Sequence, residues 1–199
     1  MLKVIKPAVC AVVLAALQPY GALAVPISYL YTGTGSGSLS GTAFANAAFT
    51  ITANGDTDSI VPAQGSDPIM NVHLNTSIAI TGLGTFAITP TSGTWIADRC
   101  CGGIGAYLGP NWITLDEPAF TKSGYGLDTN FGPVTDSTPL NTEQFTNVPT
   151  SGGLLSMPVV SSVTFLAISA VPEPATLLLW AGGITVVMTG VARRRAGRS

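Results

Sequence analysis

Charged side chains are scarce in this chain. They make up 9% of its 199 residues, whereas about 25% is usual for a soluble protein. The shortage of positive charge is greatest in the middle, because six of the eight lysines and arginines lie close to the two ends. Between residues 25 and 171 only Arg99 and Lys122 are basic, against nine acidic residues, which gives a net charge of −7. Such a region offers no basic surface to nucleic acid or anionic lipid, so we exclude nucleic acid as its partner.

Histidine is almost absent as well, and this limits the chemistry open to the chain. His73 is the only histidine, so it is the only imidazole base available to a serine or cysteine nucleophile. It alternates with Val72 and Leu74, a pattern that predicts that His73 points away from an apolar face into solvent. One histidine also leaves too few ligands for a zinc site. We therefore predict no catalytic residue, no metal site and no cofactor, and we expect that the chain is not an enzyme.

The chain begins with a segment typical of a secretory signal peptide. Two lysines within Met1–Lys6 precede an uncharged apolar run, Ala8–Leu17. This run is too short to span a hydrocarbon core of about 30 Å, so we expect it to be removed rather than kept as an anchor. Ala22 and Ala24 place small side chains at the two positions that a signal peptidase recognises. The predicted cut lies between Ala24 and Val25.

The end of the chain combines three features in a fixed order. A tripeptide comes first, and its prolines cannot continue a β ladder and hold their neighbours extended, which predicts an exposed stretch. Eighteen uncharged residues, Ala175–Ala192, follow. At about 1.5 Å per residue, a helix of this length just crosses a bilayer. A basic tail, 193–199, then favours the cytoplasmic side. The tripeptide is Pro172, Glu173 and Pro174, and the stop-transfer arginines are Arg193, Arg194 and Arg195.

This ending resembles the sorting signal of PEP-CTERM proteins, which are exported proteins of Gram-negative bacteria that make exopolysaccharide. The resemblance rests on the Pro-Glu-Pro tripeptide, the apolar span and the arginines, and it covers about the last 28 residues. It implies that an exosortase, a membrane-embedded cysteine transpeptidase, recognises the tripeptide and cleaves the chain there. The implied location is the inner membrane, with the domain on the periplasmic side, and then the cell surface or the extracellular space.

Export also bears on the cysteines. Cys10 lies in the predicted signal peptide, which leaves the adjacent pair Cys100 and Cys101. An oxidising compartment favours a disulfide, but neighbouring Cα atoms lie about 3.8 Å apart, below the usual disulfide range of about 4.4–6.8 Å. A ring between these two residues would be strained, and the following Gly102 and Gly103 would help the turn to bend. We predict a vicinal disulfide; two buried free thiols, or bonds to another chain, are the alternatives.

The middle of the chain, residues 25–171, has the pattern of an all-β domain. Short runs of alternating apolar and polar residues are separated by glycine, proline and asparagine at intervals of about 8–12 residues. We therefore predict a single antiparallel β-sandwich with a jelly-roll-like arrangement, between the signal helix and the transmembrane helix. Specific expectations are a turn at Asn54-Gly55-Asp56, an apolar face with Met70, Val72 and Leu74 that continues through Ile78, Ile80, Phe86 and Ile88, a last strand within Val159–Ala170, and a loop-rich segment over 124–153.

Low charge and abundant serine, threonine, asparagine and glycine give a neutral surface that suits contact with polysaccharide. Sugars stack on exposed aromatic rings, and the candidates are Tyr29, Tyr31, Trp95, Tyr107, Trp112 and Tyr125, each of which is also typical of a half-buried core position. The leading interpretation is a structural or exopolysaccharide-associated protein of the envelope or biofilm matrix. The alternative is a carbohydrate-active envelope hydrolase. An aromatic cluster would favour binding, and a carboxylate pair about 5 Å apart would favour hydrolysis.

Overall fold

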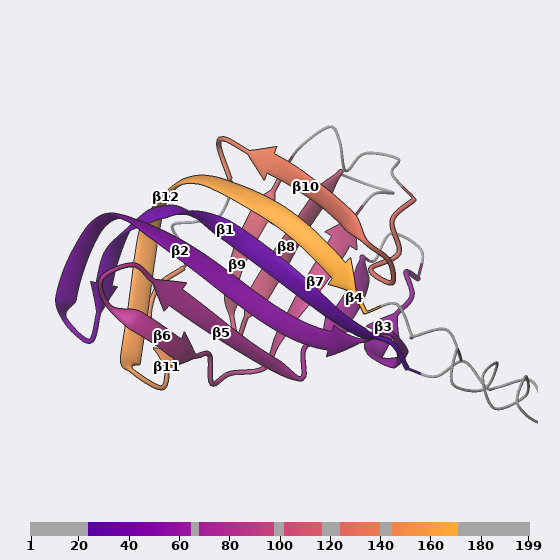
Figure 1. Ribbon diagram of the computed structural model, residues 1–199, viewed down its shortest axis with the longest axis horizontal. Helices are drawn as coiled ribbons and strands as arrows, with labels where there is room; N and C mark the ends of the chain where they lie inside the picture. Colours follow the sequence, from indigo (N-terminus) through magenta and orange to yellow (C-terminus); the bar gives the residue numbers. More distant parts are fainter. Residues whose placement is uncertain (1–23, 65–67, 98–101, 117–123, 140–144, 171–199) are drawn as a thin grey trace, which may run out of the picture.

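Two antiparallel sheets, one lying over the other, make up the described part of the chain (Figure 1). The structure is a computed structural model that describes residues 24–64, 68–97, 102–116, 124–139 and 145–170. Every strand pair in these ranges is antiparallel. The prediction of an all-β antiparallel fold is therefore confirmed. No helix in the described ranges is long and apolar enough to cross a membrane, and the predicted span lies outside these ranges.

The larger sheet has seven strands in the order β10-β12-β1-β2-β5-β6, with β11 paired to the first residues of β12. The first and last long strands, β1 and β12, are neighbours in this sheet. The sheet therefore pairs residues from the two ends of the domain sequence. Its strands are β1 (Pro26–Leu39), β2 (Thr42–Asp56), β5 (Asn75–Ile80), β6 (Gly84–Ala87), β10 (Phe131–Asp136), β11 (Val148–Thr150) and β12 (Gly153–Ser169).

The smaller sheet has five strands in the order β3-β4-β7-β8-β9 and forms the second layer. β7, β8 and β9 follow one another in the sequence and form a meander, with β4 and the short β3 added at one edge. Its strands are β3 (Ile60–Val61), β4 (Ile69–Val72), β7 (Ser92–Ala97), β8 (Gly103–Leu108) and β9 (Asn111–Leu115).

Glycines let β1 lie very close to its neighbours and interrupt its register. The pairing of β1 with β12 shifts between Thr34 and Gly35 and again between Ser36 and Ser38, and the pairing with β2 shifts between Gly35 and Gly37. A Cβ on Gly37 would collide with the Ser156 carbonyl oxygen on β12. Bulges of this kind bend a strand, which agrees with the curved β1 and β12 in Figure 1.

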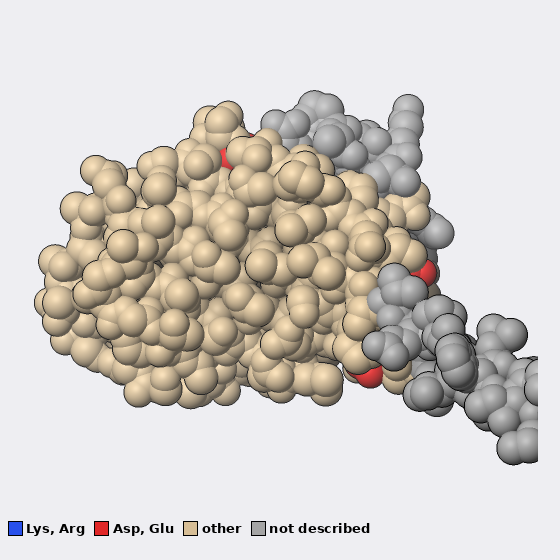
Figure 2. Space-filling view, in the orientation of Figure 1, with Lys and Arg blue, Asp and Glu red and all other residues tan. Residues whose placement is uncertain are grey.

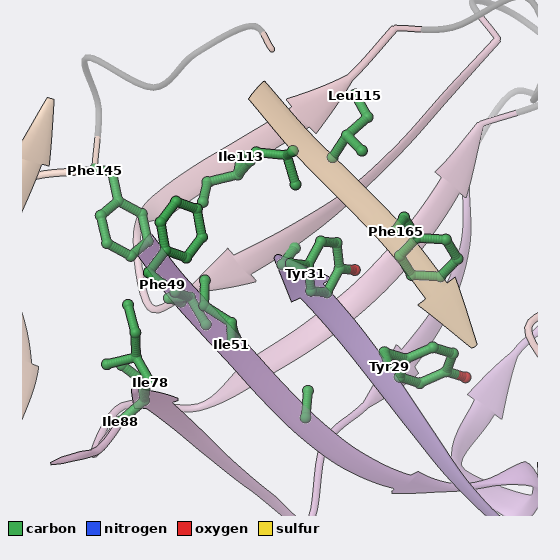
Figure 3. Close-up of a cluster of buried hydrophobic side chains, with 14 of the residues drawn as sticks. Tyr29, Tyr31, Phe49, Ile51, Ile78, Ile88, Ile113, Leu115, Phe145 and Phe165 are labelled. Carbon is green, nitrogen blue, oxygen red and sulfur yellow. The ribbon is translucent and has the colours of Figure 1, made fainter. Parts of the chain in front are cut away.

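The core fills the space between the two sheets (Figure 3). Ile51 on β2 and Ile113 on β9 reach it from opposite layers, and each is 0–1% exposed. The Phe165 ring lies 5.1 Å from the Tyr31 ring, centroid to centroid. Full burial of a large apolar side chain stabilises a fold by about 1.5–3 kcal/mol. The predicted apolar positions Ile78, Ile80 and Ile88 belong to this core, each at most 8% exposed. For Val72 and Leu74 the predicted core face is wrong, because they are 37% and 70% exposed.

Both ends of the described domain leave from the same place. Ile27 pairs with Ser169 in the β1–β12 ladder, and the Ala170 amide donates to the Pro26 carbonyl at 2.9 Å. The β1 and β12 ends therefore lie side by side, near η1 (Thr57–Ser59) (Figure 1).

Three local predictions can be compared with these strands. The long last strand is confirmed, and β12 starts earlier than expected, at Gly153. The turn expected at Asn54-Gly55-Asp56 is wrong, because β2 continues to Asp56 and the chain turns in η1. The expected loop-rich segment, 124–153, also contains β10 and β11. β10 pairs with residues far along the sequence, such as Phe131 with Ala167, and leaves little local pattern, whereas the short β11 forms a tight hairpin with the start of β12, in which Thr150 pairs with Gly153.

Candidate functional site

A cluster of polar side chains lies buried between the sheets, and His73 is at its centre. The prediction of a solvated His73 is wrong: the residue is 9% exposed, while Val72 and Leu74 are 37% and 70% exposed. The local reason is that residues 73 and 74 cross from one sheet to the other. The His73 amide donates to the Ser92 carbonyl of the smaller sheet, and the Leu74 amide donates to the Asn54 carbonyl of the larger one.

Hydroxyl groups surround both ring nitrogens of His73. Its Nδ1 lies 3.1 Å from the hydroxyls of Thr76 and Ser92, and its Nε2 lies 2.9 Å from Thr94 Oγ1. Thr94 Oγ1 is in turn 2.9 Å from the Tyr31 hydroxyl, which donates to the Gly105 carbonyl at 3.1 Å. Since Tyr31 has one proton, Thr94 donates to Tyr31, and Thr94 then accepts from His73 Nε2–H. The network thus places a proton on His73 Nε2.

The contact between Ser92 and His73 has the composition of a nucleophile and a base, but its surroundings favour a structural role. Ser92, Thr76 and His73 are 4%, 4% and 9% exposed, so a substrate would have to open the sandwich to reach them. Burial lowers the pKa of His73 to about 4, so the imidazole is neutral at neutral pH. The hydrogen bonds that the structure gives its ring go to hydroxyls, and none goes to the carboxylate that orients a catalytic histidine.

The buried network also ties the larger sheet to two strands of the smaller sheet, β7 and β8. Tyr31, on β1 of the larger sheet, contacts Thr94 on β7 and Gly105 on β8. Desolvation in this position raises the pKa of Tyr31 well above its usual value. A separate buried hydrogen bond also joins the two layers: Asn71 Nδ2, on β4, donates to the Tyr29 hydroxyl, on β1, at 2.8 Å. Side chains of both layers are therefore held in register by hydrogen bonds that water does not reach.

The outer face of the smaller sheet is apolar, which is unusual for a sheet face turned away from the core. The strand register arranges it in two rows across the sheet. Neighbours in each row are directly opposite in register, and no residue in either row is charged. The first row runs Val61, Met70, Trp95, Gly105 and Thr114, and the second runs Val72, Gly93, Tyr107 and Trp112.

Two rings on this face lie over glycines of the neighbouring strand. Tyr107 stands opposite Gly93, and a Cβ on Gly93 would lie 2.5 Å from Tyr107 Cζ. Trp95 stands opposite Gly105, and a Cβ there would lie 2.8 Å from Trp95 Cε2. The rings therefore rest on bare backbone, an arrangement that stabilises strand glycines. Trp112 lies beside both, with centroids 5.8 Å from Tyr107 and 6.1 Å from Trp95. We call Trp95, Tyr107 and Trp112 the aromatic platform.

The six aromatic candidates thus separate into two groups. Tyr29, Tyr31 and Tyr125 are at most 5% exposed, so their assignment to a sugar-binding surface is wrong. The platform residues lie on the outer face, and Trp112 is 38% exposed. A local sequence signal distinguishes two of them: a glycine lies two positions before each, Gly93 before Trp95 and Gly105 before Tyr107. Residues two apart in a strand lie on the same face of the sheet, so each ring has a glycine beside it on its own face.

Two of the described carboxylates, those of Asp56 and Asp136, bind backbone amides. Asp56 Oδ1 accepts from the Asp58 amide at 2.8 Å and caps η1. Asp136, 3% exposed, accepts from the Asp116 amide at 3.0 Å and the Thr138 amide at 2.7 Å. These contacts hold local turns and the start of the segment after β9.

Several predicted residues lie outside the described ranges: Cys100, Cys101, Pro172, Glu173, Pro174, Arg193, Arg194 and Arg195. Their assignments stay predictions. Of the predicted cleavage site, both residues are described. Ala24 is exposed, and the Val25 amide donates to Thr57 Oγ1 at 3.0 Å while its carbonyl accepts from the Thr57 amide at 3.1 Å.

The described residues define a two-sheet antiparallel β protein whose smaller sheet carries two outer rows of uncharged, partly aromatic side chains. No protein family, curated protein or solved structure matches this chain.

Proposed function

We propose that this chain is an exported, non-enzymatic protein of the cell envelope or extracellular matrix that is sorted by an exosortase and associates with exopolysaccharide. Residues 1–24 direct export and are removed, and Ala175–Ala192 anchor the chain in the inner membrane. The exported domain, 25–171, is a jelly-roll-like sandwich on the periplasmic side. The observation that carries the proposal is the ordered ending: Pro172-Glu173-Pro174, then eighteen uncharged residues, then three arginines.

The way in which the domain ends supports this proposal. Ala170 is hydrogen bonded to Pro26, at the domain edge, and Val171 alone separates it from the tripeptide. A processing enzyme that cuts there would release the sandwich with its last strand intact. The described residues also carry little charge: the face in Figure 2 shows few acidic side chains, and the described residues include no lysine or arginine. A neutral surface suits a protein embedded in polysaccharide.

The alternative of an envelope hydrolase has less support. Among the described carboxylates, Asp56 and Asp136 hold backbone amides, and the buried His73 is enclosed by hydroxyls. The aromatic platform is the feature that a binding protein would need.

The sorting signal can be tested separately from membrane insertion. Replacing Pro172-Glu173-Pro174 by three alanines leaves the span and the arginines in place, so the chain still inserts with the same orientation. We expect this variant to accumulate at full length in the inner membrane, as measured by fractionation and immunoblotting. The matched control is Val171→Ala, which changes a neighbouring residue and leaves processing unaffected. Processing and release of the triple-alanine variant at the normal rate would reduce the tripeptide to a linker and contradict the proposal.

A second pair of variants tests the span itself. Each arginine in Leu178→Arg and Leu179→Arg costs about 2.5–3.5 kcal/mol for insertion, so the double variant escapes in soluble form without sorting. The control double variant, Leu178→Ile with Leu179→Ile, keeps the hydropathy and inserts normally.

A further inference from the structure

We propose that the aromatic platform, Trp95, Tyr107 and Trp112, is a binding site for a single chain of neutral, β-linked hexopyranose units. This inference rests on the association with exopolysaccharide proposed above, and it names the surface and the chemical class that would carry it. The platform joins three neighbouring strands, β7, β8 and β9, and thus extends across the sheet rather than along one strand.

The first argument is the direction of the rings. Trp95 and Tyr107 lie across the bare backbone of Gly105 and Gly93, so one face of each ring is against the sheet, and both side chains remain partly exposed. A pyranose with equatorial substituents presents axial C–H groups on its two faces, and these groups pack against the negative face of an aromatic ring. The platform therefore offers the aromatic surface that such a sugar needs, and the sheet backbone supports it.

The second argument is rigidity behind the platform. Tyr31 from the other sheet bonds to Thr94, the neighbour of Trp95, and to the carbonyl of Gly105, on which Trp95 lies. The backbone under the rings is thus fixed by hydrogen bonds between the layers. A ligand that stacks on a fixed surface loses less free energy to the ordering of protein groups.

The third argument is charge. The two rows of the outer face contain no charged side chain, and the described residues contain no lysine or arginine. Among the described residues of this face, a polyuronate or a phosphorylated glycan would find no cation to pair with. A neutral sugar loses nothing by this absence, so charge favours a neutral chain.

The angles between the rings favour a single soluble polysaccharide chain over the flat surface of a polysaccharide crystal. The Trp112 plane is inclined by 59° to Trp95 and by 43° to Tyr107. Three rings inclined in this way cannot lie together on one flat crystal face. They can contact successive units of a single chain that twists, so the ligand is a soluble strand rather than a crystalline surface.

The test is affinity electrophoresis of the full-length protein in native gels. The protein is extracted in a polyoxyethylene detergent, because a detergent with a sugar headgroup would compete for the site. Gels contain hydroxyethylcellulose, a neutral soluble β-glucan, or alginate, an anionic polyuronate, or no polysaccharide. We expect retardation in hydroxyethylcellulose and none in alginate. No retardation in hydroxyethylcellulose, or equal retardation in alginate, would overturn the proposal.

Matched variants assign the binding to the platform. Trp112→Ala removes the most exposed ring and weakens binding roughly three- to tenfold, while Trp112→Phe keeps a ring and retains most of the affinity. Leu154→Ala removes a more exposed apolar side chain, 54% exposed, from the other sheet and changes nothing. If Leu154→Ala weakens binding as much as Trp112→Ala, the platform is not the site.

Tryptophan fluorescence provides an independent readout. The chain has three tryptophans, and two of them are on the platform, so Trp180→Phe leaves only Trp95 and Trp112 to emit. Adding hydroxyethylcellulose to this variant should quench or shift its emission, and unchanged emission would contradict stacking.

A second copy of the chain is the competing occupant of this face. If Trp112→Ala converts a dimer to a monomer in sedimentation velocity and hydroxyethylcellulose does not retard the protein, the face is an interface between copies.

These outcomes are separable from those of the sorting experiment. Loss of glycan binding with normal processing would reject the platform and leave the sorting proposal intact. Normal glycan binding by a triple-alanine chain that is also processed normally would reject sorting and leave the platform intact.

Discussion

At the scale of single residues, burial changes the acid–base behaviour of His73. Its ring lies 5.8 Å from that of Tyr29, and its nitrogens contact hydroxyls of Thr76, Ser92 and Thr94. These partners are neutral, so nothing nearby offsets a positive charge on the imidazole. Desolvation lowers the pKa of His73 to about 4, from about 6.5 in an unfolded chain.

This difference predicts a loss of stability in mild acid. Between pH 6.5 and pH 4 the unfolded chain binds more protons at His73 than the folded one, so the free energy of unfolding falls as the pH falls. From pH 7 to pH 4 we expect a decrease of about 3 kcal/mol from this residue. Urea unfolding at a series of pH values measures it. The control, His73→Gln, retains every carboxylate and should lose this part of the slope; parallel curves for the two proteins would refute the assignment.

At the scale of strands, glycine positions decide how closely neighbours lie. In β1, a Cβ on Gly37 would meet the Ser156 carbonyl and lie 2.9 Å from Met157 Cα, both backbone atoms of β12. In β8, a Cβ on Gly103 would find its nearest neighbour, the Leu115 carbonyl oxygen, at 3.4 Å, an ordinary contact. Position 37 therefore has no room for a larger side chain than that of glycine, whereas position 103 has room for alanine.

This contrast gives a matched pair of alanine substitutions. Gly37→Ala must push β1 and β12 apart, and we expect it to lower the free energy of unfolding by roughly 1–3 kcal/mol. Gly103→Ala fits in the available space and should change it by less than about 0.5 kcal/mol. Both values come from urea unfolding at neutral pH. Equal effects of the two substitutions would mean that the closeness of β1 and β12 does not depend on Gly37.

The strands also explain which features the sequence could predict. Ile78, Ile80 and Ile88 alternate with polar residues, and the core that they form is visible in that pattern alone. Val72 and Leu74 show a similar pattern, yet they face outwards, because His73 between them is the buried residue. Its hydrogen-bond partners are Thr76 on β5 and Ser92 and Thr94 on β7, and Thr94 in turn contacts Tyr31 on β1. No local pattern contains those contacts. The platform was predictable only as a set of candidates, since register decides which aromatic residue stands opposite a glycine.

At the scale of the whole molecule, the fold constrains where the chain can be cut at its start. Val25 is the first residue held by the domain, through its amide to Thr57 Oγ1 and its carbonyl to the Thr57 amide. Pro26 then begins β1, and Ile27, 1% exposed, enters the core. Removal of residues through Ala24 leaves all of these contacts intact. The new amino group keeps the donor that Thr57 accepts, at an edge of the domain that water reaches.

A cut further along would be costly, and this sharpens the cleavage prediction. Loss of Ile27 would remove a buried side chain worth about 1.5–3 kcal/mol and shorten the β1 ladder with both β2 and β12. We therefore expect mass spectrometry of the exported protein to give an amino terminus at Val25. Ala22→Gln, which places a large side chain where the peptidase needs a small one, should leave the precursor uncleaved, whereas Leu23→Ala at the neighbouring position should be processed normally. An exported protein that retains Met1, or that begins at Ile27 or later, would show that the segment before Val25 is not a signal peptide cleaved at the edge of the fold.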